Sequence, residues 1–168
     1  RRIAAEMTRI KMALDGSGTP MTISNEANAL IYMNDSARAL WSAMEPEMVK
    51  RVPGFSVATM FNHSLVDFFD DENVKAAYRV ELTAPRTLDV NMCGRILQVT
   101  ATPVRDADGR YMGRANQWLD RTEEVRVENE VAEIGGGAAR GDFTQRVAVD
   151  GKNGFFLRLA NDLNTLMQ

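Results

Sequence analysis

Two segments of alternating polarity, 88–92 and 96–102, limit the fold of this chain more than any other feature. A period of two places successive side chains on opposite faces of a β-strand, so each segment predicts a strand with one buried face. Residues 93–95 form a predicted hairpin turn, and the Asp-Gly signal within 106–109 predicts a second one. With the segment 111–119 that follows, the pattern predicts three consecutive antiparallel strands.

Upstream of these strands, the pattern predicts a second, shorter hairpin from residues 21–24 and 29–34. A helix over 36–44 follows, and the prolines and glycine in 45–69 then predict short helical turns instead of strands. The carboxylates at 70–72 place negative charge at the start of another short helix. The order of elements therefore predicts an α+β domain with five strands.

Helical stripes flank this domain on both sides. Apolar residues recur at spacings of three and four near the N-terminus, after residue 122 and in the last fifteen residues. The three stripes are Ile3, Met7, Ile10 and Leu14; Val127, Val131, Ile134 and Ala138; and Phe156, Leu159, Leu163 and Leu166. They can pack on the domain's own sheet or on a second subunit, and we expect a homodimer through the flanking helices.

Composition excludes several classes of protein. The 168 residues carry a net charge of −3 without a basic face, so we expect no nucleic-acid partner. No segment reaches the roughly 20 apolar residues of a membrane span, so we expect none in this piece of chain. Cys93 is the single cysteine, which predicts a reducing, cytoplasmic location without an internal disulfide. The chain does not begin with Met, which suggests a fragment of a longer protein.

The order of elements, followed by Asp120-Arg121-Thr122, resembles a PAS sensor domain that ends in its Asp-x-Thr junction. The tail resembles a HAMP module, with 141–147 similar to the start of its connector and 159–167 to the end of its second helix. The resemblance implies a PAS fold, a five-stranded antiparallel sheet with short helices on one face. It divides the chain into a linker helix (1–18), a PAS domain (19–122) and a HAMP-like segment (123–168).

Residues 31–34 and 117–124 are most similar to aerotaxis-type bacterial methyl-accepting chemotaxis proteins, whose PAS domain holds haem b and senses oxygen. In those relatives a histidine that ligates the iron follows the phenylalanine matching Phe69, but here that position is Asp70. A carboxylate is a poor replacement for imidazole on haem iron. Trp118 matches the tryptophan that faces the bound gas. The cofactor is therefore left open by the sequence.

Five residues are candidates for the ligand site: Trp118, Val99, Met33, Met60 and His63. His63 is the only histidine, so it is either a haem ligand in place of the family's or an ordinary loop histidine. Trp118 and the methionines either line a pocket or fill the core. We expect no metal site, except His63 if haem is bound.

Two further clusters have simpler interpretations. The carboxylates Asp70, Asp71 and Glu72 can bind a divalent cation, but stabilisation of a helix start accounts for them. Cys93 with His63 can form a nucleophile and base, but no oxyanion-type loop accompanies them.

We therefore expect a sensory input module, not an enzyme. A small ligand or gas in the PAS pocket changes the domain, and Asp120 and Thr122 relay the change to a HAMP dimer and to kinase-control modules beyond it. Asp120 and Glu123 predict a capping box at the start of the output helix. The alternative is a ligand-free PAS domain that dimerises and spaces helices.

Overall fold

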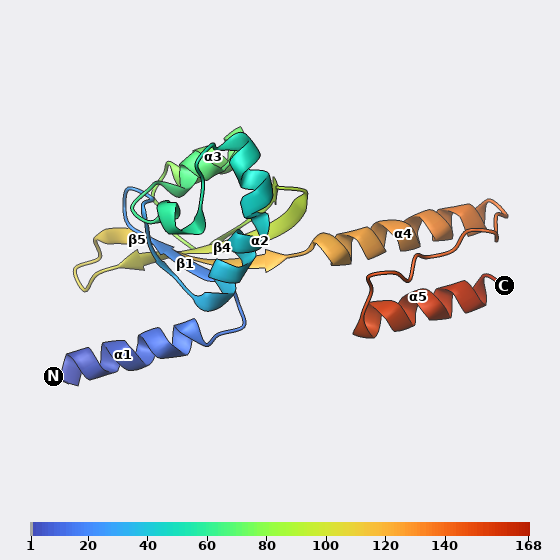
Figure 1. Ribbon diagram of the computed structural model, residues 1–168, viewed down its shortest axis with the longest axis horizontal. Helices are drawn as coiled ribbons and strands as arrows, with labels where there is room; N and C mark the ends of the chain where they lie inside the picture. The colour runs from blue at the N-terminus through green and yellow to red at the C-terminus, as the bar shows by residue number, and fades with distance from the viewer. Residues whose placement is uncertain (1) are drawn as a thin grey trace. The chain divides into compact units, whose positions relative to one another are not determined.

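The computed structural model describes residues 2–168, which form two compact units (Figure 1). The first, the sheet unit, ends at Leu119, and the second, the C-terminal unit, spans Asp120–Gln168. The sheet unit contains, in order, α1 (Arg2–Asp15), β1 (Met21–Ser24), β2 (Leu30–Met33), α2 (Asp35–Arg51), the 3-10 turns η1 (Val57–Met60) and η2 (Leu65–Phe68), α3 (Glu72–Tyr78), β3 (Arg86–Met92), β4 (Arg95–Arg105) and β5 (Tyr111–Asp120). The last residue of β5, Asp120, is the first residue of the C-terminal unit. The C-terminal unit contains α4 (Thr122–Ala139) and α5 (Gly154–Leu166).

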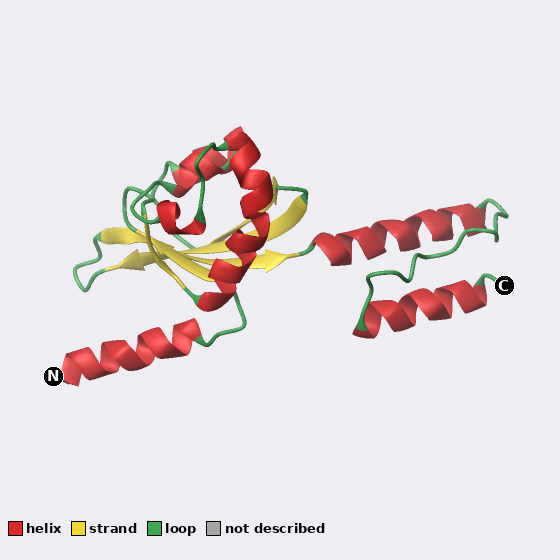
Figure 2. Cartoon of the chain, in the orientation of Figure 1, coloured by secondary structure: helices red, strands yellow, loops and turns green. Residues whose placement is uncertain are grey.

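The five strands form one antiparallel sheet in the order β2-β1-β5-β4-β3, so the predicted hairpin and meander are both present. Figure 2 shows α2, α3 and the short turns between them on one face of this sheet. The two central strands, β1 and β5, pair with Met21 opposite Gln117, and the backbone N–H of Trp118 donates to the carbonyl of Pro20 at 2.9 Å. The chain therefore enters β1 and leaves β5 at the same end of the sheet.

Close approach of β1 and β5 depends on a glycine. Gly113 has a φ of 129° and a side chain there would collide with the backbone of Ser24 and Asn25. Only glycine adopts this conformation without strain, so this position fixes how closely the two central strands pack.

The helix α2 is longer than predicted. It continues through Pro46 to Arg51, whereas the sequence predicted an end near Met44. The buried residues Ala37, Trp41, Met44 and Met48 keep the helical spacing of four, three and four across the proline. Burial of Met48 offsets the roughly 3 kcal/mol that a proline costs inside a helix. The short helical turns predicted further on are present as η1 and η2.

The core of the sheet unit lies between the sheet and the helices of this face. Its buried residues come from α2, both 3-10 turns, α3 and the inward faces of the strands. Leu97, Val99 and Ala101 of β4 are buried while their neighbours are more exposed, as the alternating pattern predicted.

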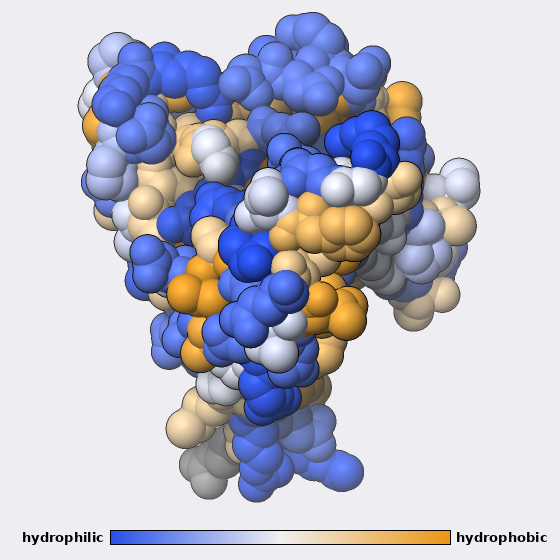
Figure 3. All heavy atoms as spheres, turned by 90° about the vertical axis from the view of Figure 1, so that its right-hand side faces the viewer, coloured by the Kyte–Doolittle hydropathy of each residue, from blue (hydrophilic) through white to orange (hydrophobic). Residues whose placement is uncertain are grey.

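The C-terminal unit has a much smaller core. One cluster consists of Ile134 of α4, Val147 of the connector, Ala160 of α5 and Met167 directly after it, and Val127 of α4 is buried as well. Asn164 holds the connector in place, because its amide accepts from the N–H of Val147 at 2.6 Å and donates to the carbonyl of the same residue at 2.9 Å. In the space-filling view of Figure 3, apolar surface lies among polar side chains.

The predicted capping box at the start of α4 is wrong. The N-cap residue is Arg121, and no side chain caps it. Asp120 precedes the cap and accepts hydrogen bonds from the backbone N–H of Thr122, at 3.0 Å, and from its hydroxyl. Asp120 and Thr122 thus bond to each other, and Glu123 is not part of this arrangement.

Within residues 2–168, no helix combines the length and the apolar character needed to cross a lipid bilayer.

Candidate functional site

Four of the five predicted ligand-site residues lie together in the interior of the sheet unit. Met33 comes from β2, Met60 from η1, Val99 from β4 and Trp118 from β5, and all belong to one cluster of buried residues. None is more than 4% exposed. We call these four residues the interior site. That they bind a ligand stays a prediction.

Aromatic rings surround Trp118. The ring centroid of Trp41 lies 5.4 Å away with the planes at 82°, and that of Phe69 lies 6.3 Å away. Phe68 in turn lies edge-on to Trp41 at 6.4 Å. Such edge-to-face contacts fill an interior densely and stabilise it beyond simple burial. A ligand at the interior site would lie beside these rings.

The two indole N–H groups of the core differ. That of Trp118 donates to Thr22 Oγ1 at 2.9 Å, so its hydrogen bond is already made. That of Trp41 is fully buried and has no hydrogen-bond partner within the described residues. A buried donor without an acceptor is costly and uncommon, because it loses its bond to water. A small ligand with an acceptor atom would supply the missing partner.

His63 is not part of the interior site. It is exposed, and it lies on a surface pocket beside Phe55, Thr59 and Asp67. Its backbone N–H donates to Met60 and its carbonyl accepts from Leu30, so the main chain at His63 is held in place.

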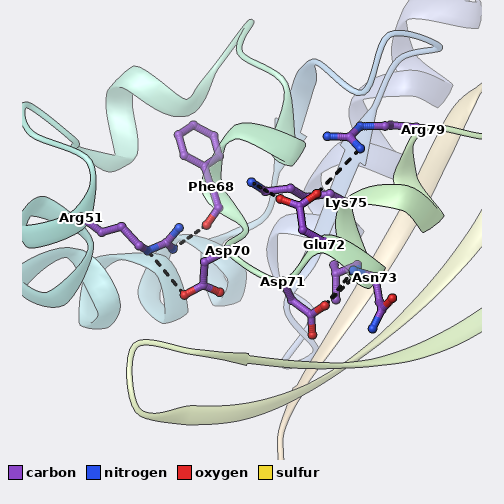
Figure 4. A network of polar contacts seen from close by, with 9 residues as sticks. Arg51, Phe68, Asp70, Asp71, Glu72, Asn73, Lys75 and Arg79 are labelled. Atoms are coloured by element: carbon purple, nitrogen blue, oxygen red, sulfur yellow. Dashed lines mark hydrogen bonds and ion pairs between the residues drawn. The ribbon is translucent and has the colours of Figure 1, made fainter.

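Asp70, at the position where the resemblance implies a haem ligand, is on the surface (Figure 4). Its side chain is 55% exposed, and a carboxylate oxygen lies 3.9 Å from Nε of Arg51. Arg51 also donates to the carbonyl of Phe68 at 2.6 Å, so this arginine bridges the end of α2 to η2. The ring of Phe69, by contrast, is buried. These residues do not fit haem held in the family's manner: the expected ligand is an exposed carboxylate, and neither it nor His63 faces the packed interior.

The neighbouring acidic residues each have a separate partner, as Figure 4 shows. Asp71 caps α3 by accepting from the N–H groups of Asn73 and Val74, and Glu72 pairs with Lys75 at 3.3 Å. Within residues 2–168, no group of three or more His, Cys, Asp or Glu side chains is arranged to hold a metal ion. The helix-start interpretation therefore describes Asp71 and Glu72, whereas Asp70 lies before the helix and faces Arg51.

Cys93 lies in the turn between β3 and β4, with a φ of 53°. Its side chain packs partly against the core, and burial raises the pKa of its thiol. A raised pKa keeps the thiol protonated at neutral pH, which is the opposite of what a nucleophile requires.

Sequence reasoning missed four buried polar residues near Trp118: Thr22, Tyr78, Arg114 and Asn116. All are at most 1% exposed. A signal was available for two of them, because Arg114 and Asn116 lie four and two residues before Trp118 and therefore share its face of β5. Tyr78 and Thr22 come from other elements, and only the fold brings them to this face.

No family model matches the chain. It is 35% identical over 164 residues to the methyl-accepting chemotaxis protein McpB of Pseudomonas aeruginosa, a match that covers 98% of this chain and 24% of that protein. The chain thus spans about a quarter of that relative's length.

Solved structures share the fold at low identity. One is the Aer2 receptor of Vibrio cholerae, described as a dual PAS-haem oxygen sensor (TM-score 0.52, 23% identity, 61% of this chain and 93% of that chain). Another is an RNA-binding light-oxygen-voltage receptor (TM-score 0.53, 15% identity, 79% of this chain and 38% of that chain). A third is the PAS domain of a protein from Colwellia psychrerythraea (TM-score 0.50, 14% identity, 70% and 98%). The predicted α+β class and PAS fold are confirmed.

Proposed function

We propose that the chain is a sensory input module of a bacterial chemoreceptor. The observation that carries this proposal is the course of β5, whose inward face holds Trp118 in the core and whose last residue, Asp120, leads into α4 without an intervening loop. The 35% identity to a methyl-accepting chemotaxis protein over nearly the whole chain supports it. The action is conformational, and no catalytic step is assigned to any residue.

The ligand of this module is a small molecule or gas at the interior site, where Trp118, Val99, Met33 and Met60 supply an apolar surround. The unpaired N–H of Trp41 supports a ligand with a hydrogen-bond acceptor. We do not propose haem held through Asp70, and haem held through His63 would require that residue to turn inward from its exposed position. A ligand shifts the domain only by the difference between its affinities for two conformations.

Output passes through Asp120 and Thr122 to a HAMP-like segment, residues 123–168, that works as a homodimer. Support for the dimer comes from side chains that are apolar and exposed in the C-terminal unit: Phe143, Phe155 and Leu166, which are 58%, 64% and 79% exposed. Exposed side chains of this size on a small helical unit favour burial against another surface. Further HAMP or kinase-control modules would receive the change.

The second candidate is a ligand-free PAS domain that dimerises and spaces helices. One observation favours it: the rings of Trp41, Phe69 and Trp118 pack against one another, and the indole N–H of Trp118 already has its acceptor in Thr22. A domain of this kind needs no ligand to complete its core.

Absorbance and native mass spectrometry of the purified chain separate the two candidates. We expect added mass from a co-purified small ligand, no haem or flavin bands, and only weak, non-saturating absorbance on titration with haem. Trp118→Leu should weaken ligand retention.

A chain that purifies without added mass, and binds nothing in a screen of small polar and apolar compounds, favours the ligand-free module. Stoichiometric haem binding lost in His63→Ala would show that His63 is the ligand. Stoichiometric haem binding that survives this substitution would contradict our choice of ligand.

A further inference from the structure

Buried hydrogen bonds connect α3 to Trp118 across the interior of the sheet unit. The hydroxyl of Tyr78 donates to Oδ1 of Asn116 at 3.2 Å, and the amide of Asn116 donates to Oγ1 of Thr22 at 3.3 Å. The indole of Trp118 donates to the same oxygen at 2.9 Å. We call Tyr78, Asn116, Thr22 and Trp118 the interior chain. All four are at most 1% exposed, so water does not compete for these bonds.

Arg114 fastens one end of the interior chain. Its guanidinium donates to the carbonyls of Ala77, Tyr78 and Val80, at 3.5, 3.4 and 2.8 Å, around the end of α3. It also lies 4.6 Å from the centroid of the Tyr78 ring. A cation at the C-terminal end of a helix is favourable, because unpaired carbonyls make this end negative. The end of α3 and the strand β5 therefore tend to move together.

The other end of the interior chain points along β5 towards the output. Arg114, Asn116 and Trp118 are alternate residues of this strand and share its buried face, and Asp120 is the next residue in the same alternation. Burial raises the pKa of Tyr78, which keeps its hydroxyl protonated and able to donate. The ring centroid of Phe69 lies 5.0 Å from that of Tyr78 and 6.3 Å from that of Trp118. Phe69 is therefore a neighbour of both ends of the interior chain.

We propose that Tyr78 and Thr22 are positioning residues that couple the helical layer to the output strand. Displacement of α3 or Phe69 changes the bond from Tyr78 to Asn116, and the shared acceptor Thr22 passes this change to Trp118 and to the end of β5. The proposal rests on the proposed function, because it names the internal regulation of the interior site. It assigns a role to two hydroxyl groups that touch neither Asp120 nor Thr122.

The test combines two measurements on the full 168-residue chain. Amide hydrogen exchange reports opening of the first turn of α4, and the indole resonances report the hydrogen bonds of the two tryptophans, which Trp41→Phe assigns. Tyr78→Phe keeps the ring and removes the hydroxyl. We expect a shifted Trp118 indole resonance and exchange about tenfold faster over residues 120–126, the size of effect produced by one lost hydrogen bond. Thr22→Val should act alike, and Thr22→Ser should restore both values.

Tyr32→Phe is the matched control. It removes another tyrosine hydroxyl, one that donates to Asp15 at the end of α1. The Trp118 indole resonance and the exchange rates of residues 120–126 should stay unchanged. The proposal is overturned if Tyr78→Phe leaves both readouts unchanged, or if exchange rises uniformly over β3 and β4 as well, as a purely structural role predicts. Should Tyr78→Phe not fold, the Thr22→Val and Thr22→Ser pair decides by the same criteria. These measurements need no ligand, so failure to find one would count against the proposed function alone.

Discussion

The two units of this chain differ in the number and kind of side chains that they bury. The sheet unit encloses large aromatic rings and a set of buried polar side chains whose hydrogen bonds are made within the unit. The C-terminal unit buries only a few apolar residues and leaves Phe155 and Leu166 mostly exposed. A unit with a large, densely packed core can keep its fold alone, whereas one with so little buried surface gains most from a partner. In the function proposed above, the first unit detects and the second responds.

The largest expected effect concerns the stability of the sheet unit and the place of Trp118 in its core. Trp118→Ala should destabilise the sheet unit by about 3–5 kcal/mol, because it removes a buried ring and one of the two hydrogen bonds that Oγ1 of Thr22 accepts. Leu119→Ala, at the neighbouring and 54% exposed position, should cost under about 0.5 kcal/mol. Urea unfolding monitored by circular dichroism measures both. Equal losses for the two variants would contradict a core built around Trp118.

The next effect concerns the incomplete core of the second unit. Phe155→Ser together with Leu166→Ser should weaken self-association by about tenfold or more, since burying one such side chain contributes about 1.5–3 kcal/mol. Sedimentation equilibrium measures this, with Val80→Ser, at a 56% exposed position of the sheet unit, as the control. If the unaltered chain is monomeric at tens of micromolar, the dimer proposal fails.

The smallest expected effects are those of pH on stability. Hydrogen bonds from Tyr32 and Thr144 lower the pKa of Asp15 and of Asp142 respectively, so the stability these carboxylates add is present above their ordinary value and is lost as the pH falls through the lowered one. Acid therefore weakens both units.

Alkali is expected to act on the sheet unit through Tyr32. Burial and the bond to Asp15 raise the pKa of Tyr32 to about 12. The stability that it contributes is complete below its ordinary value near 10 and is lost as the pH rises through about 12. The near-ultraviolet absorbance of the unaltered chain minus that of Tyr32→Phe should titrate at about pH 12. A difference titration near 10 would show that the bond between Tyr32 and Asp15 is absent in solution.

Much of the fold followed from periodicity, because alternating and helical spacings report directly on which side chains are buried. The end of α2 did not, because a proline ordinarily ends a helix, whereas here the helical spacing from Met44 to Met48 continues across Pro46. The interior site was predicted in part: alternation placed Val99 inward, and a resemblance singled out Trp118. The partners of Trp118 were missed, because Thr22 and Tyr78 reach it through a strand order and a helix position that local patterns do not encode.

The central claim, that β5 transmits a change of state into α4, is tested most directly in a receptor. Residues 1–168 can replace the matching segment of the Pseudomonas aeruginosa chemotaxis protein, and the kinase control proposed above can be assayed in that chimera. Asp120→Ala or Thr122→Ala removes the bonds at the junction at a cost of about 0.5–2 kcal/mol, too little to unfold a typical domain. We expect kinase activity to shift about fivefold or more in a folded receptor, as a coupling free energy of about 1 kcal/mol implies, with Glu123→Ala unchanged. Activity equal to that of the unaltered chimera in both junction variants would contradict the account.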